Sequence, residues 1–153
     1  MRSVTIRSLT LALAAALLPL AAAAYSPRTD EAPGAYPLKK RYADFTLAER
    51  AGLRAMYEGM PESDEPPFPA AGMRTIVDEV SEISGSYKAY GFVSIFVSVD
   101  AQGNATGVRV MKAPNLEAAK AISYVLIKAK YKPAVCSGKP CAMEFPFRFN
   151  LTL

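Results

Sequence analysis

Residues 138–153 have the sequence GKPCAMEFPFRFNLTL, and the alternation inside this stretch decides the predicted fold. From Met143 to Leu151 every second residue is methionine, phenylalanine or leucine, and the residues between them are polar or proline. A period of two is typical of a β-strand that buries one face. Pro146 lies in the middle of this strand and has no N–H group to donate to a neighbour. The sequence therefore predicts that the last strand lies at an edge of its sheet.

The outer side of this edge follows from the position of Pro146. Along an antiparallel strand, the backbone N–H and C=O groups of alternate residues point to the same side. Residues with the parity of Pro146 must therefore point these groups away from the paired strand, while the phenylalanines between them bond to it. We predict that four residues form the outer edge: Glu144, Pro146, Arg148 and Asn150. We expect Pro146, together with Arg148, to blunt this edge against self-pairing. The alternative is that Pro146 sets the register of an incoming strand.

A hairpin precedes the last strand. Residues 92–99 (FVSIFVSV) and 105–112 (ATGVRVMK) alternate as strands. The intervening DAQGN is typical of a tight turn, with Gly103 where a positive φ is needed. On the return strand we expect three side chains to point inward: Thr106, Val108 and Val110.

Three helices are predicted around these strands. Residues 46–60 begin with a capping box of Thr46 and Glu49, and residues 73–84 place apolar side chains on one side before GSYKAYG breaks the pattern. The third helix begins at the N-cap Asn115 and runs toward Lys130. Its expected buried face consists of Leu116, Ala119, Ile122, Val125 and Leu126.

The order helix, helix, strand, strand, helix, strand predicts a two-layer α+β fold. We expect a three-stranded antiparallel sheet with the third helix packed on one face. Residues 25–45 are rich in proline and charge, and we expect them to be flexible or loosely docked. The predicted organisation is a leader at 1–24, a lead-in with one helix at 25–65, and the α+β domain at 66–153.

The first residues have the layout of a secretory signal peptide. Arg2 and Arg7 are followed by a short apolar run at 9–20 and by four alanines. We expect cleavage after Ala24 and export of the rest, which contains no segment that could span a bilayer. The alternative is an uncleaved leader that anchors the chain in the inner membrane.

Charge and composition exclude several functional classes. Without residues 1–24 the formal net charge falls from +4 to +2, because two arginines are lost. The bases are dispersed, so we predict a solvated face and no nucleic-acid partner. The chain has no histidine, and the acids at 62–65 and 78–79 lie in polar surroundings, so we expect them to be ordinary solvated carboxylates. We predict no catalytic residue, no metal ligand and no cofactor.

The two cysteines are predicted to form a disulfide. Cys136 and Cys141 are the only cysteines, and the loop CSGKPC between them contains glycine and proline for a tight bend. An even cysteine count in an exported chain is typical of disulfide bonding. A redox motif favours two intervening residues, and a metal site needs more ligands.

The series of motifs resembles the C-terminal domain of the TonB family. The first part of the match is GFVSIFVSVDAQGN at 91–104, which contains the glycine, the strand and the VD..G turn of the family. The second part is the helix after Asn115 and the element at Tyr131, Pro133 and Ala134 that follows it. The third part is the GKP at 138–140 with the closing strand. The resemblance extends over about residues 66–153, because PPFPAAG at 66–72 is similar to the lead-in of some members. The family's tyrosine–proline pair before the first strand is missing, since Lys88 follows Tyr87.

The resemblance implies a periplasmic domain whose last strand receives an extended peptide by β-strand addition. The implied partner is a protein or peptide, including a segment of a TonB-dependent outer-membrane receptor. The alternative is a structural or accessory envelope protein that keeps this fold without receptor coupling. Neither function is enzymatic.

Overall fold

A computed structural model describes residues 25–29, 32–34 and 36–152. The predicted leader at 1–24 lies outside the described residues. The described part is an α+β fold with antiparallel sheets, as the sequence predicted. In the longest sheet, the central strand β2 (Gly91–Val99) lies between β3 (Ala105–Lys112) and β7 (Met143–Leu151). The last strand is therefore an edge strand of a three-stranded antiparallel sheet.

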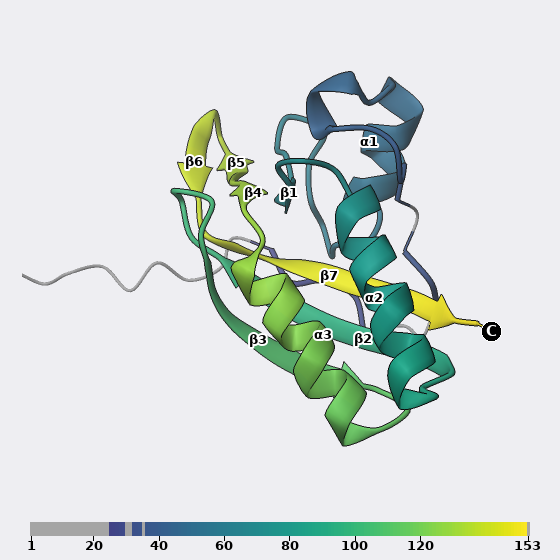
Figure 1. Cartoon of the computed structure of the whole chain (residues 1–153). Helices are drawn as coiled ribbons and strands as arrows, with labels where there is room; N and C mark the ends of the chain where they lie inside the picture. Colours follow the sequence, from purple (N-terminus) through teal and green to yellow (C-terminus); the bar gives the residue numbers. More distant parts are fainter. Residues whose placement is uncertain (1–24, 30–31, 35, 153) are drawn as a thin grey trace, which may run out of the picture.

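Two helices cover one face of this sheet. The helices α2 (Arg74–Tyr87) and α3 (Leu116–Lys128) lie next to each other across β2, β3 and β7 (Figure 1). The expected N-cap of α3 is confirmed, because the Asn115 side chain accepts a hydrogen bond from the Ala118 N–H at 2.8 Å. The helix α2 is longer than predicted. It continues through Gly85 and ends where Lys88 adopts a left-handed conformation.

The predicted capping box at the first helix is confirmed, but that helix is short. Thr46 and Glu49 exchange the two expected hydrogen bonds at the start of α1 (Leu47–Arg54). The helix ends well before Gly59, although Met56 and Tyr57 beyond it are buried. Burial of these two side chains therefore does not depend on helical spacing, which is why the sequence pattern overestimated the length of the helix.

Four short strands are additional to the prediction. They form two small antiparallel pairs above the main sheet: β1 (Phe68–Pro69) with β4 (Tyr131–Lys132), and β5 (Ala134–Cys136) with β6 (Lys139–Cys141). The β5–β6 pair is a hairpin closed by the Cys136–Cys141 disulfide, which confirms the predicted bridge. Strands of two or three residues are too short to leave an alternating pattern in the sequence.

The core lies between the sheet and the helices. The phenylalanines Phe145 and Phe147 of β7 are fully buried there beside Ile122 and Leu126 of α3. Two expectations for inward side chains are wrong. Leu116 is 67% exposed, because it lies in the first turn of α3 at the border of the sheet. Thr106 is also exposed, since a register shift in the β2–β3 ladder takes it out of the alternation.

The lead-in packs against the domain, which corrects the expectation that residues 25–45 are flexible or loosely docked. Within the described residues, Tyr42 of the short helix η1 (Tyr42–Asp44) and Phe45 after it belong to the main core cluster. Backbone hydrogen bonds at 2.8 and 3.0 Å tie Arg28 to Met56 and Glu58 to Ser26. The aromatic side chains supply enough buried apolar area to hold this proline-rich segment in place.

Candidate functional site

The outer side of β7 has the geometry that Pro146 predicts. In the β2–β7 ladder, Pro146 lies opposite Phe96, and Arg148 lies opposite Ser94. The backbone groups of Glu144, Pro146 and Arg148 all form hydrogen bonds with residues outside the sheet. These groups therefore point away from β2, as the parity argument requires.

The outer edge of β7 is occupied by the protein's own chain. The Tyr36 hydroxyl donates to the Pro146 carbonyl and accepts from the Arg148 N–H at 3.1 Å. The Gly34 N–H donates to the Arg148 carbonyl at 2.9 Å, and the Tyr57 hydroxyl donates to the Glu144 carbonyl at 2.9 Å. We call the contacts of Gly34 and Tyr36 with β7 the lead-in clasp. Its residues were not among the predicted site residues.

The ring of Tyr36 is seated between phenylalanines of β7. Its centroid lies 5.1 Å from that of Phe149, in a stacked arrangement, and 5.7 Å from that of Phe145. A Cβ atom at Gly34 would fall within the volume of the Tyr36 ring, so only glycine fits beside it. Burial raises the pKa of the Tyr36 phenol, which therefore stays protonated at neutral pH and can donate its hydrogen bond.

The four predicted edge residues differ in their surroundings. Pro146 and Arg148 are buried, and Arg148 is only 2% exposed. Glu144 is half-buried and forms an ion pair at 2.7 Å with Arg109 of β3, on the face of the sheet away from the helices. Only Asn150 is exposed, and the described residues place no hydrogen-bond partner on its outer backbone groups. The edge is thus open at its C-terminal end and covered in its middle.

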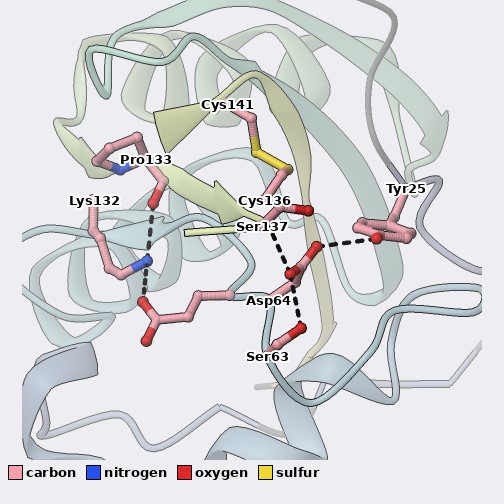
Figure 2. Close-up of a disulfide and its surroundings, with 9 residues drawn as sticks. Tyr25, Ser63, Asp64, Lys132, Pro133, Cys136, Ser137 and Cys141 are labelled. Carbon is pink, nitrogen blue, oxygen red and sulfur yellow. Dashed lines mark hydrogen bonds and ion pairs between the residues drawn. A yellow bond between two sulfur atoms is a disulfide. The ribbon is translucent and has the colours of Figure 1, made fainter. Parts of the chain in front are cut away.

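A second anchor of the lead-in lies at the disulfide hairpin. Asp64 accepts hydrogen bonds from the Ser137 N–H and the Tyr25 hydroxyl, both at 3.0 Å, and from the Ser63 hydroxyl at 3.1 Å. Figure 2 shows Asp64 between Tyr25 and the loop that the disulfide closes. Asp64 is 2% exposed, so the expectation of a solvated carboxylate is wrong at this position. The hairpin approaches from far along the chain, which sequence patterns do not reveal.

The neighbouring Glu65 joins three segments through its charge. Its carboxylate pairs with Arg50 of α1 at 3.1 Å and with Lys132 of β4 at 2.9 Å. Its backbone exchanges two hydrogen bonds with Val135 at 2.8 and 2.9 Å. Burial lowers the pKa of Lys132, and the hydrogen bond to Glu65 acts in the opposite direction. Figure 2 also shows the Lys132 ammonium next to the Pro133 carbonyl, which it contacts at 2.9 Å. These contacts favour a structural role for Asp64 and Glu65.

Removing the disulfide is expected to destabilise the protein by about 2 kcal/mol, because a sequence separation of 5 closes a small loop in the unfolded chain. The variant is the double substitution of Cys136 and Cys141 to serine, measured by urea unfolding against the oxidised wild type. Reduced wild type serves as the control and is expected to match the variant. Equal midpoints for the oxidised and reduced wild type would contradict a stabilising bridge.

We expect the protein to lose stability in acid because of Asp64. The Ser137 N–H bond, with those from Tyr25 and Ser63, holds the pKa of this carboxyl below its usual range. The unfolded chain therefore binds a proton at higher pH than the fold does, so this contribution is present above about pH 4 and is lost as the pH falls further. Asp64→Asn is expected to be less stable than wild type at pH 7, with the gap narrowing toward pH 2. Urea unfolding midpoints of both proteins between pH 7 and pH 2 measure this difference in stability. A difference that does not change with pH would contradict the prediction.

The opposite edge of the sheet, β3, is more exposed. Between β3 and α3 lies an apolar groove of about 380 Å³, lined by residues that include Val108, Leu116 and Tyr124. Val110 of β3 also lines it and is 45% exposed, so the expected inward position of Val110 gives only partial burial. The two edges of the sheet are thus different surfaces, one clasped and one bordered by an apolar groove.

Within the part of the chain that the structure describes, no three acidic, cysteine or histidine side chains are placed to hold a metal ion. In the same part, no helix is long and apolar enough to cross a membrane. What the edge of β7 offers is a row of backbone donors and acceptors.

The fold defines a class: two-layer α+β domains in which helices cover one face of a three-stranded antiparallel sheet whose last strand is an edge. Residues 84–151 match the family model described as Gram-negative bacterial TonB protein C-terminal, so this part of the chain is similar to the C-terminal domain of TonB proteins. This family consists of non-enzymatic, periplasmic protein-interaction domains. No curated protein matches the chain.

The match begins at Ser84 and covers the end of α2, the whole main sheet and α3. The segments that form the clasp lie before it, at Gly34 and Tyr36, as do Tyr57 and the Asp64 anchor. The lead-in is therefore an addition of this chain to the part that the family model describes.

Proposed function

We propose that this protein is a periplasmic interaction domain that binds an extended segment of a partner by β-strand addition to β7. The predicted edge residues Glu144, Pro146, Arg148 and Asn150 supply the backbone groups. The partner is a protein or peptide, and the proposed role includes TonB-dependent outer-membrane transport, which the match of residues 84–151 to the TonB C-terminal model supports. The observation that carries the proposal is the hydrogen bonding on the outer side of β7. Those groups already bind a segment that is not part of the sheet.

Strand addition at this edge requires a rearrangement of the lead-in. A partner strand that pairs with Pro146 and Arg148 takes the position that Tyr36 and Gly34 hold. It can first dock at the exposed Asn150 and then extend toward Pro146. The Tyr57 bond to Glu144 lies at the far end of the row and marks the limit of such a segment.

The second candidate function is a structural or accessory envelope protein without receptor coupling. One observation favours it: the middle of the edge is filled by the chain itself, as natural proteins do to prevent unwanted pairing of edge strands. Under this alternative the clasp is permanent and β7 takes no partner.

Photo-crosslinking in intact cells separates the two functions. A benzoyl-phenylalanine replaces Asn150 at the open end of the edge, and a matched variant carries it at Tyr124, which is 59% exposed on α3. We expect the Asn150 probe, and not the Tyr124 probe, to crosslink to a defined segment of an outer-membrane receptor identified by mass spectrometry. Absence of any crosslink specific to Asn150, in iron-starved and iron-replete cells, would favour the accessory protein.

A further inference from the structure

We propose that the β7 edge takes an extended segment that carries a tyrosine, and that the lead-in clasp is an internal copy of that ligand which a partner displaces. This inference rests on the proposed strand addition and names the chemistry of the partner. The family model matches residues 84–151, so Gly34 and Tyr36 lie outside the matched part of the chain.

The backbone of the edge lacks one donor at Pro146, and a tyrosine hydroxyl can bind the neighbouring backbone groups without needing that donor. A partner strand normally exchanges two hydrogen bonds with each outward residue, but Pro146 offers only its carbonyl. The partner carbonyl opposite it would stay unpaired, which is unfavourable at a buried position. A phenol avoids this problem, because its hydroxyl donates to the Pro146 carbonyl and accepts from the Arg148 N–H without placing a backbone carbonyl opposite the missing N–H of Pro146.

The phenylalanines of β7 provide a seat for the ring of that tyrosine. Tyr36 stacks on Phe149 at 5.1 Å and meets Phe145 at a tilt at 5.7 Å. Phe145 is fully buried and Phe149 is half-buried, so the seat has a fixed inner side and an accessible outer side. An aromatic side chain from another chain can therefore enter where Tyr36 leaves.

The way the clasp is attached makes it replaceable. Tyr36 is half-buried, whereas Tyr57, which also bonds the edge, is only 2% exposed. The lead-in has separate anchors on both sides of the clasp. On one side Tyr25 is bound to Asp64, which also accepts from the Ser137 N–H of the disulfide hairpin. On the other side Tyr42 and Phe45 lie in the main core cluster. The clasp can thus open while the rest of the lead-in stays docked, and a partner must compete with a segment that is always nearby.

The test measures peptide binding by two-dimensional NMR on wild type and on Tyr36→Ala. The probe is the peptide APGAYPL, which copies residues 32–38, and its matched control is APGAAPL. We expect APGAYPL to shift the Arg148 and Phe149 amides of Tyr36→Ala, and to bind wild type about tenfold more weakly because its edge is closed. The control peptide is expected to bind Tyr36→Ala about tenfold more weakly than APGAYPL does.

Three results would overturn the inference. Equal binding of the two peptides removes the tyrosine requirement but leaves strand addition standing. Equal binding of APGAYPL to wild type and Tyr36→Ala removes the competition by the clasp. Binding of neither peptide removes the site itself, while the Asn150 crosslink still reports on the proposed function. If Tyr36→Ala does not fold, Tyr36→Phe keeps the ring and removes only the hydroxyl, and APGAYPL must then bind it more tightly than wild type.

Discussion

Gly34→Ala is expected to open the lead-in clasp and to raise the affinity of β7 for an extended peptide about tenfold. The added Cβ falls within the ring of Tyr36, so the two side chains cannot both keep their places. The ring must leave its seat on Phe149, and the Tyr36 hydroxyl then leaves the Arg148 N–H. Tenfold tighter binding corresponds to about 1.4 kcal/mol of binding free energy, which is the amount that competition by the clasp is expected to cost the peptide in wild type. Titration of labelled APGAYPL into wild type and variant measures it.

The matched control is Gly107→Ala in β3, where an added Cβ meets only the Ser98 hydroxyl, at 4.0 Å. It is expected to leave peptide affinity unchanged, because it lies on the opposite edge strand. A Gly34→Ala protein that folds and binds the peptide no better than wild type would show that the clasp does not limit access to β7.

Phe145→Ala is expected to cost about 3–5 kcal/mol of unfolding free energy, the largest effect of any single core substitution considered. The side chain is 0% exposed. Its ring lies 6.0 Å from Phe68, 5.8 Å from Tyr131 and 5.7 Å from Tyr36. One residue therefore joins the main sheet to the β1–β4 pair and to the lead-in, and truncating it leaves a cavity among all three.

The control for this prediction is Phe149→Ala in the same strand. Phe149 is half-buried, and its ring contacts are to Tyr36 and to Phe147, so its loss is expected to cost less than half as much as that of Phe145. Urea unfolding followed by circular dichroism gives both values. Similar costs for the two phenylalanines would mean that Phe145 is not the common contact of the three parts.

Local patterns in the sequence predicted the main elements of the fold. The period of two in β2, β3 and β7, the caps at Thr46 and Asn115, and the short cysteine loop each depend on neighbouring residues. The edge position of β7 also followed from one local fact, the missing N–H of Pro146. These features were predictable because each is encoded within a few residues of the place where it acts.

The closed state of the edge was not predictable in the same way. Tyr36 and Pro146 are 110 residues apart in the sequence, and no periodicity links them. A proline-rich, charged segment has the composition of a disordered one, and three aromatic side chains in the lead-in, Tyr36, Tyr42 and Phe45, were enough to override that tendency. The signal that could have been noticed is the glycine two residues before Tyr36, a spacing that admits a tyrosine ring close to the backbone.

Burial of Asp64 was missed for a related reason. Polar sequences such as ESDE at 62–65 are usually solvated, and the Ser137 N–H that binds Asp64 comes from a hairpin 73 residues later. The prediction for Arg148 was right in one respect and incomplete in another. Its outward backbone was predicted, but its burial depends on the packing of other segments against β7, which an alternation pattern does not report.

The most direct measurement is the hydrogen exchange of the Arg148 amide in wild type and in Tyr36→Phe. The phenol oxygen of Tyr36 accepts this N–H at 3.1 Å, and the substitution removes that oxygen while keeping the ring. The Phe147 amide is the internal control, because its residue pairs with Ile95 of β2 on the inner side of the strand. We predict that protection of Arg148 falls at least about tenfold in Tyr36→Phe while that of Phe147 is unchanged. Equal protection of Arg148 in both proteins would contradict the account of a self-occupied edge.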